Sequence, residues 1–218
     1  MVTSTDDPIG EERKTGPAEE RDPLSLEEIG INPRESGGAA LDPAALFGND
    51  HPIILEVGSG KGRFLVEQAH SHPELNYLGI EISLHYFRHL VDRIWRHRLE
   101  NVRIVNFDAQ RVIGRMLPDG SVREIHIYFP DPWPRRREQK RRFVRPDVAR
   151  DMQRVLHPDG EGVFVTDHRD YWEAAVPLLD EVFAIESGEI TDRPPRTNYE
   201  VKYRKEGRRI YEVVFRRK

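Results

Sequence analysis

From Leu46 onward, short apolar runs alternate with amphipathic stretches of helical period, and this alternation restricts the fold more than any other feature. Six runs are predicted to be strands: 53–57, 77–82, 102–107, 125–129, 162–166 and 209–215. Continuous apolar strands separated by helices are typical of a parallel sheet covered on both faces. The sequence therefore predicts an α/β fold in which residues 46–218 form one domain.

The first 45 residues have a different composition. Residues 1–50 hold 12 of the 38 acidic side chains and 4 of the 34 basic ones, so 26 acids and 30 bases remain for residues 51–218. Residues 1–45 are also polar and contain five prolines, a composition that cannot bury enough apolar surface to offset chain entropy. We predict an acidic, largely flexible segment over residues 1–45 and a basic body behind it.

The residue types that are missing exclude several kinds of chemistry. The chain has no cysteine, which excludes disulfides, zinc–thiolate sites and cysteine-dependent pyrimidine methylation. His126, His157 and His168 have no recognisable metal-ligand spacing, so no metal is expected. The N-terminus is polar and no apolar run approaches membrane-spanning length, which predicts a cytoplasmic protein without a membrane segment.

A glycine-rich turn follows the first predicted strand directly, in the sequence Glu56-Val57-Gly58-Ser59-Gly60-Lys61-Gly62. A dinucleotide site would require its third glycine at Arg63, and a phosphate-binding P-loop would require serine or threonine at Gly62. The sequence therefore disfavours both a dinucleotide site and a P-loop. Without a dinucleotide site, a nicotinamide oxidoreductase is disfavoured as well. An acid just before the turn instead suits a ligand with a cationic end. S-adenosylmethionine, with its ammonium and sulfonium groups, fits this requirement.

Four acidic residues follow four successive predicted strands: Glu56, Glu81, Asp108 and Asp131. Singly, each has an ordinary structural explanation as a helix-dipole partner, a strand end or a cap. Together they would meet at the carboxyl edge of the sheet, where open α/β sheets bind ligands. There Glu56 could meet an ammonium, Glu81 a ribose and Asp108 an adenine amino group.

The stretch after the fourth strand combines prolines, one carboxylate, Trp133 and a run of cations from Arg135 to Arg142. Prolines stop both sheet and helix, so Asp131 and Trp133 are expected on a rigid lip. Cations beside an aromatic point to nucleic acid, although charge runs are more often solvated loops and Trp133 could equally pack beneath the lip. The order Asp-Pro-Trp-Pro differs from the Asp/Asn-Pro-Pro-aromatic of amine methyltransferases.

On these motifs the chain resembles the bacterial tRNA (guanine-N7-)-methyltransferase family from Leu46 to the C-terminus. The residues that carry the resemblance are Leu46-Phe47-Gly48, Leu55 to Gly62, Gly79-Ile80-Glu81, Asp108-Ala109, Phe129 to Trp133 with Lys140-Arg141-Arg142, Thr166-Asp167 and Thr197-Asn198-Tyr199-Glu200. The resemblance implies a Rossmann-like class I methyltransferase with a mostly parallel seven-stranded sheet and helices on both faces. It also implies methylation of a variable-loop guanine, position 46 of the tRNA, with S-adenosylmethionine as methyl donor.

The resemblance assigns residues to three roles. The cofactor site would comprise Glu56, Gly58, Gly60, Glu81, Asp108, Ala109 and Asp131, with Asp131 also the catalytic candidate. The substrate guanosine would contact Arg135, Asp167, Thr197, Asn198, Tyr199 and Glu200. The RNA backbone would contact Arg137, Lys140, Arg141 and Arg142. Arg135 stands where the family commonly has lysine. Besides tRNA the sequence indicates no partner, and it leaves monomer and homodimer open.

The chemistry of guanine N7 supports roles of this kind. N7 holds an in-plane lone pair and loses no proton on methylation, so the enzyme must supply orientation and charge placement more than a strong base. Asp131 or Glu200 could accept hydrogen bonds from guanine N1–H and its amino group. Two alternatives stay open at this point: another S-adenosylmethionine-dependent RNA or small-molecule methyltransferase, and a non-catalytic RNA-binding protein.

Overall fold

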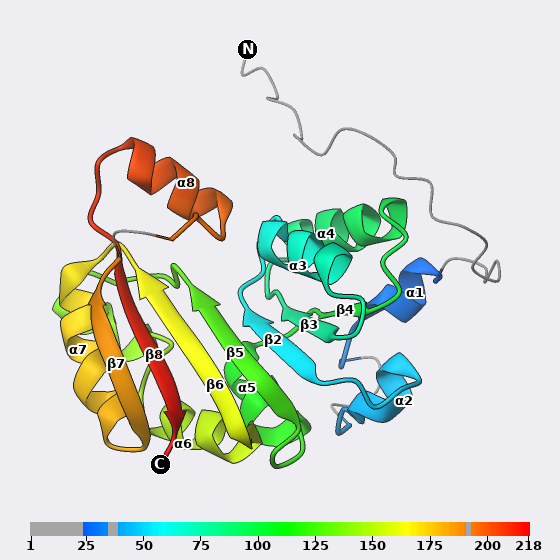
Figure 1. The fold of residues 1–218 in the computed structure, drawn as a ribbon, viewed down its shortest axis with the longest axis horizontal. Coiled ribbons are helices and arrows are strands. Elements are labelled where there is room, and N and C mark those ends of the chain that lie inside the picture. Colours follow the sequence, from blue (N-terminus) through cyan, green and yellow to red (C-terminus); the bar gives the residue numbers. More distant parts are fainter. Residues whose placement is uncertain (1–23, 35–38, 191–192) are drawn as a thin grey trace.

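The computed structural model describes residues 24–34, 39–190 and 193–218. These residues form a sheet in the order β1-β4-β3-β2-β5-β6-β8-β7 (Figure 1). The strands are β1 (Gly30–Ile31), β2 (Ile53–Val57), β3 (Asn76–Ile80), β4 (Val102–Val105), β5 (Val122–Tyr128), β6 (Leu156–Thr166), β7 (Phe183–Glu189) and β8 (Tyr211–Arg217). Only β8 runs antiparallel to its neighbours β6 and β7. The predicted mostly parallel α/β sheet is confirmed, with eight strands in place of seven.

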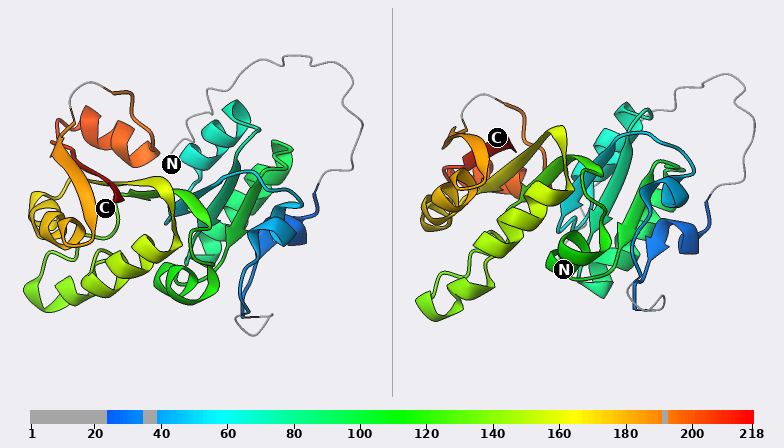
Figure 2. Two further views of the ribbon diagram at one scale, coloured as in Figure 1. Left: turned by 60° about the horizontal axis from the view of Figure 1, so that its bottom comes forward. Right: turned by 90° about the horizontal axis from the view of Figure 1, so that it is seen from below.

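Helices cover both faces of this sheet, as predicted (Figures 1 and 2). They are α1 (Leu26–Ile29), α2 (Pro43–Phe47), α3 (Arg63–Ser71), α4 (Leu84–Arg96), α5 (Ala109–Arg111), α6 (Pro146–Val155), α7 (Arg169–Asp180) and α8 (Asn198–Lys205), with a π-helical turn η1 (Val112–Met116) and a 3-10 helix η2 (Arg136–Arg141). Side chains of α3 and α4 belong to one apolar cluster, and those of η1, α6 and α7 belong to the other. The sheet therefore separates two cores.

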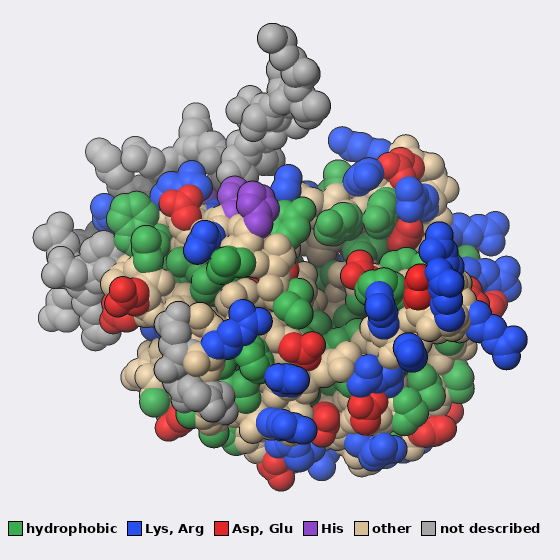
Figure 3. Space-filling view, turned by 180° about the vertical axis from the view of Figure 1, so that it is seen from behind, with side chains coloured by type: hydrophobic (Ala, Val, Ile, Leu, Met, Phe, Trp, Pro, Cys, Tyr) green, Lys and Arg blue, Asp and Glu red, His purple; other side chains and the backbone are tan. Residues whose placement is uncertain are grey.

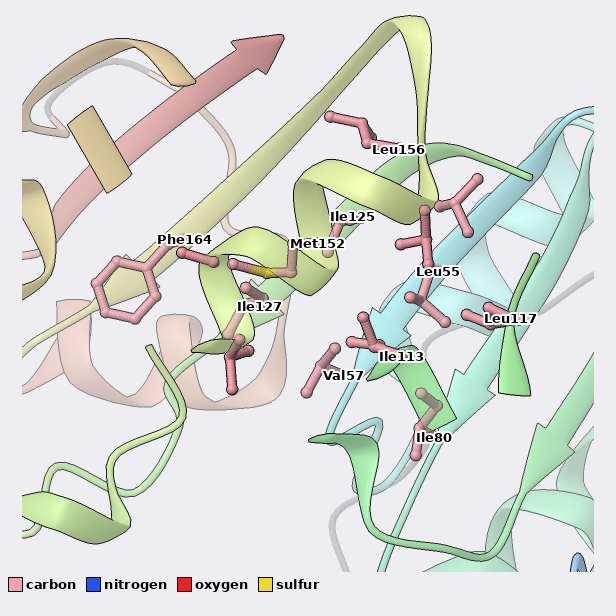
Figure 4. Packing of buried hydrophobic residues seen from close by; sticks show 14 of the residues in the cluster. Leu55, Val57, Ile80, Ile113, Leu117, Ile125, Ile127, Met152, Leu156 and Phe164 are labelled. Atoms are coloured by element: carbon pink, nitrogen blue, oxygen red, sulfur yellow. The ribbon is translucent and has the colours of Figure 1, made fainter. Parts of the chain in front are cut away.

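The alternation of side chains along β2 decides which core receives each residue. Leu55 and Val57 belong to the cluster with α6 and α7, whereas Ile54 belongs to the cluster with α3 and α4. Figure 4 shows the first cluster, in which Leu55 and Val57 meet side chains of β5 and Met152 of α6. Because successive strand residues point to opposite faces, Glu56 faces α3 and α4.

The edge of the sheet at β1 comes from the segment that the sequence places outside the folded domain. Ser25 caps α1 with a capping box, and β1 then pairs in parallel with β4, Gly30 opposite Ile104. A side chain at Gly30 would lie 2.8 Å from the Phe87 ring, so this edge can approach α4 only because residue 30 is glycine. Residues 24–34 thus extend the sheet, while residues 1–23 lie outside the described residues.

Candidate active site

The glycine turn between β2 and α3 has the backbone shape that its composition predicts. Gly58, Gly60 and Gly62 have φ angles of 75°, 53° and 71°, values that side chains strongly disfavour. A Cβ at Gly62 would also lie 2.0 Å from Leu90, so α4 packs directly on the turn. At Gly58 and Gly60 the corresponding space is nearly empty. The turn therefore exposes bare backbone, which a ligand can approach closely.

Glu81 at the end of β3 fixes this turn in place. One carboxylate oxygen accepts a hydrogen bond from the Gly60 N–H at 2.8 Å, and the other accepts from the Ser83 N–H at 2.7 Å. Asn106 in turn donates to the Glu81 carbonyl at 2.8 Å. Each carboxylate oxygen keeps a lone pair for a further donor. Glu81 can therefore hold the turn and still accept from ribose hydroxyls.

A cleft of about 280 Å³ opens above the turn. Its lining comes from parts far apart in the sequence: Glu56, Gly58 to Phe64, Tyr86, Tyr128, Thr197, Asn198, Tyr199 and Lys202. Figure 1 shows why they meet, since α8 stands beyond the carboxyl ends of β5 and β6, on the same side as α3 and α4. The cleft thus has one wall on the glycine turn and another on α8.

Glu56 lies at the bottom of this cleft without the partners that a buried carboxylate needs. Its side chain is 3% exposed, and its Oε2 has no hydrogen-bond partner among the described residues, nor has Ser59 Oγ. Burial raises the pKa of Glu56 to about 8; the neighbouring Ser59 hydroxyl opposes this rise, and the charge of Glu81 adds to it. A buried orphan acceptor costs free energy unless a donor arrives. The ammonium of S-adenosylmethionine is a donor of the right charge for this position.

The other predicted cofactor residues lie further from the cleft lining. Asp108 caps α5 by accepting from the Arg111 N–H at 3.2 Å, and Ala109 packs against the core beside it. Asp131 is exposed on the loop after β5. It is nevertheless close enough to influence Tyr199, whose pKa is raised by burial and by the negative groups Asp131 and Glu81. Tyr199 lines the cleft, whereas Asp131 is not among its lining residues.

The loop that carries Asp131 has an unusual backbone. Phe129 and Trp133 have φ angles of 49° and 42°, which non-glycine residues rarely adopt. The Phe129 ring packs against Tyr203 of α8 at 5.4 Å. Trp133 is partly buried, and the Arg141 guanidinium lies 4.8 Å from its ring. One face of Trp133 is therefore already occupied by a cation of η2.

Of the predicted substrate residues, Thr197, Asn198 and Tyr199 line the cleft. Glu200, in the first turn of α8, does not line the cleft, because it is fully buried. Its carboxylate accepts from Arg193 at 2.9 and 3.1 Å and from Arg204 at 2.6 Å. It also accepts from the Arg196 backbone N–H at 3.0 Å. This corrects the predicted contact of Glu200 with guanine, since its oxygens are spent on anchoring α8.

The basic run divides into exposed and buried cations. Arg135, Arg137, Lys140 and Arg141 are exposed on or next to η2, and Figure 3 shows Lys and Arg side chains gathered to one side of a central hollow. Arg142 is 5% exposed. It donates to the Pro132 carbonyl at 2.8 Å and forms an ion pair with Asp170. The prediction that Arg142 contacts the RNA backbone is therefore corrected: this residue ties the Asp131 loop to α7.

The remaining substrate candidate, Asp167, lies at the end of β6. Its carboxylate accepts from Arg208 at 2.7 Å and is not among the residues that line the cleft. Conversely, sequence reasoning assigned no role to Tyr86 and Tyr128, which do line it. The signal for Tyr128 was its place directly before the proline loop, at the end of a buried strand. In the described ranges we find no cluster of side chains suited to a metal ion, and no helix there is long and apolar enough to cross a bilayer.

Comparison with known proteins agrees with this geometry. Residues 50–213 match a family described as a putative methyltransferase. The chain is 36% identical to the tRNA (guanine-N(7)-)-methyltransferase of Alkalilimnicola ehrlichii, over 85% of this chain and 81% of that protein. For the protein of the same name from Bacillus cytotoxicus the identity is 35%, over 84% and 85% of the two chains. The fold of the present chain is similar to that of the antibiotic-resistance methyltransferase Kmr, with a TM-score of 0.56 and 18% sequence identity. The match covers 77% of this chain and 88% of Kmr. The chain thus belongs to the tRNA (guanine-N(7)-)-methyltransferase family.

Proposed function

We propose that this protein transfers a methyl group from S-adenosylmethionine to N7 of the guanine at position 46 in the variable loop of tRNA. The observation that carries the proposal is the buried Glu56 carboxyl beside the glycine turn, whose Oε2 has no hydrogen-bond partner among the described residues, in a cleft whose opposite wall is α8. A cationic cofactor satisfies this carboxyl. A negatively charged RNA is attracted by the exposed cations of η2.

The residues around the glycine turn would hold the cofactor. Glu56 receives its ammonium, the bare backbone at Gly58 and Gly60 lets it approach, and Glu81 accepts from its ribose. The bound cofactor supplies an electrophilic methyl on a sulfonium. Because Glu56 is largely neutral in the free protein at pH 7, it gives up its proton when the ammonium arrives.

The residues of the opposite wall would orient the guanine. Asp131 accepts hydrogen bonds from guanine N1–H and its amino group, which rejects adenine and stabilises the positive charge that develops on the purine. Tyr199 is half exposed at the cleft and offers a flat ring against the base. The methyl group would move to the N7 lone pair as its bond to the sulfonium sulfur breaks and leaves a neutral thioether, and no base would be needed because N7 carries no proton.

The cations of η2 would hold the RNA backbone. Arg136 and Lys140 are exposed and form no ion pair within the described residues, so phosphates need not displace an acid to reach them. Such contacts add affinity without base selectivity. A tRNA substrate also implies that the enzyme works in the cytoplasm.

The test is transfer of labelled methyl from S-adenosylmethionine to unmodified tRNA, followed by mass analysis of the nucleosides. We expect N7-methylguanosine, and its loss when guanine 46 is replaced by adenine. Methylation that persists in the substituted tRNA would overturn the position. Cofactor binding without transfer to any tRNA would overturn the substrate while leaving the cofactor site intact.

A further inference from the structure

Three polar side chains lie in a row on the buried face of β5 that looks toward α3. His126 Nε2 lies 2.9 Å from Glu124 Oε2, and His126 Nδ1 lies 2.9 Å from the Tyr128 hydroxyl. His126 and Tyr128 are each 6% exposed. The Phe64 ring of α3 covers both, with centroid distances of 4.5 and 5.2 Å. Polar atoms buried this deeply are tolerated only when each has a partner.

The chemistry of the groups fixes the direction of every hydrogen bond in this row. Hydrogen bonding from His126 lowers the pKa of Glu124, so that carboxylate only accepts and His126 Nε2–H must donate to it. Burial lowers the pKa of His126, which favours the neutral ring, and with Nε2–H directed at Glu124 the Nδ1 atom is then the acceptor. The Tyr128 O–H therefore donates to Nδ1. The Tyr128 oxygen is left to accept from Arg196 Nη1, which lies 3.3 Å away.

Arg196 connects this row to the wall of the cleft formed by α8. It directly precedes Thr197, the N-cap of α8, and its own backbone N–H donates to Glu200 at 3.0 Å. The row also passes beside the cofactor side, because its middle member His126 is the register partner of Glu56 on the neighbouring strand β2. Tyr128 itself lines the cleft. The row thus connects the strand next to Glu56 with the start of α8.

We propose that His126 and Tyr128 are positioning residues, which together with Glu124 and Arg196 form a directed hydrogen-bond relay that sets the first turn of α8 over the cofactor cleft. The inference rests on the proposed function, because the readout is methylation of tRNA. The relay acts through Arg196 on the place of Thr197 and Tyr199, and leaves the glycine turn and Glu81 untouched.

The first test is Tyr128→Phe, which removes one hydroxyl and keeps the ring against Phe64. Losing one such bond at a cleft wall should lower kcat/KM for tRNA roughly five- to tenfold, mainly through KM. The dissociation constant of S-adenosylmethionine should change less than about twofold. The matched control is Tyr77→Phe, at a tyrosine of β3 buried in the same apolar cluster outside the relay, and it should leave both quantities unchanged. Equal kinetics in Tyr128→Phe and the wild type would overturn the relay.

A double-mutant cycle distinguishes a relay from two separate contacts. Arg196→Met removes the donor and keeps an apolar stem. If Tyr128 and Arg196 act through one another, kcat/KM for tRNA in the double variant should be no lower than in the less active of the two single variants. If the fold-loss in kcat/KM of the double variant equals the product of the two single fold-losses, the two contacts are independent and the relay is contradicted. A wild type that methylates no tRNA would instead refute the proposed function and leave the hydrogen-bond geometry to be tested alone.

That geometry has its own readout, which needs no substrate. Long-range proton–nitrogen correlation spectra of the histidines should show His126 as the Nε2–H tautomer in the wild type. The Nδ1 resonance should shift in Tyr128→Phe, because it loses its donor. A wild-type His126 in the Nδ1–H tautomer would reverse the order of donors and overturn the relay.

Discussion

The two walls of the cleft hold their charged groups in opposite ways. In the cofactor wall, residues 56–62 with Glu81, backbone N–H groups hold the Glu81 carboxylate, and Glu56 Oε2 has no hydrogen-bond partner in the part of the chain that the structure describes. In the basic wall, α8 together with the basic segment 135–142, which does not line the cleft, the buried charges are held mainly by other side chains, as in Glu200 with Arg193 and Arg204. Backbone donors are fixed by the fold, whereas side-chain partners must themselves be ordered. The cofactor wall is therefore preformed, and the basic wall depends on its ion pairs.

The largest expected effect separates chemistry from cofactor binding. Asp131→Ala should lower kcat about 100- to 1,000-fold, because the guanine loses its acceptor and its charge stabilisation. S-adenosylmethionine should bind as in the wild type, since the glycine turn and Glu81 keep their hydrogen bonds. Single-turnover methylation and equilibrium dialysis measure the two quantities. Full activity in this variant would remove Asp131 from the mechanism.

The second prediction concerns pH and the cofactor wall. With a pKa of about 8 in the free protein, Glu56 should release close to one proton when the cofactor binds at pH 7, and affinity should rise from pH 6 to pH 8. Calorimetry in buffers of different ionisation enthalpy counts that proton. Glu56→Gln should abolish the protein's share of the release and weaken binding roughly tenfold. The same proton count in Glu56→Gln would show that it comes from the cofactor itself.

The raised pKa of Glu56 also determines how the stability of the cofactor-free protein depends on pH. The folded pKa of Glu56 is raised from 4.5, so the folded state holds its proton more tightly than the unfolded chain does. The contribution to stability is complete below pH 4.5 and is lost as pH rises through about 8. Glu56→Gln, which cannot ionise, should flatten this part of the pH dependence of the melting temperature.

The third prediction probes the ion pairs of the basic wall. Glu200→Ala leaves Arg193 and Arg204 without their shared partner, and should destabilise α8 by about 2 to 3 kcal/mol. Hydrogen exchange should accelerate in residues 197–205 while the amides of β2 and β3 keep their protection. The matched control is Glu206→Ala, at an acid just after the same helix whose side chain is 38% exposed, with an expected effect below about 0.5 kcal/mol.

The smallest effect tests the split between exposed and buried cations. Lys140→Ala should weaken tRNA binding a few-fold and reduce the slope of log affinity against log salt by roughly 0.7 to 0.9. Arg142→Ala should instead lower the melting temperature, because it breaks the ion pair with Asp170 and the bond to Pro132. A changed salt slope without destabilisation in Arg142→Ala would return this residue to the RNA surface.

Much of the cofactor wall could be predicted from sequence, because it is local. β2 coincides with the predicted strand 53–57, and the glycine turn follows it within seven residues. β7 was not among the predicted strands because, at the sheet edge, its residues are mostly exposed and show no apolar run. β1 is two residues long and takes its stability from pairing with β4, a contact invisible in its own composition.

The basic wall was harder to predict because its roles depend on distant partners. Arg142 resembles its basic neighbours in the sequence, but its side chain is buried because it pairs with Asp170, which lies 28 residues away in the sequence. Glu200 carries the same charge as the carboxylates of the cofactor wall, but its oxygens accept hydrogen bonds from three arginines and are not available to a ligand. The row of polar side chains on β5 was not predicted. The alternation of side chains along a strand predicts which face of the sheet each residue occupies, but it does not predict that three polar residues on one face form hydrogen bonds with one another.

The left-handed backbone at Phe129 and Trp133 has a consequence for how this enzyme can change. Such conformations cost about 1 to 3 kcal/mol each in non-glycine residues. Here the prolines and the Arg142 bond to Pro132 maintain them. Glycine at position 133 would relieve that cost and raise the melting temperature, but it would release Asp131 from its fixed place. Selection for heat resistance alone would therefore favour a substitution that selection for turnover must remove.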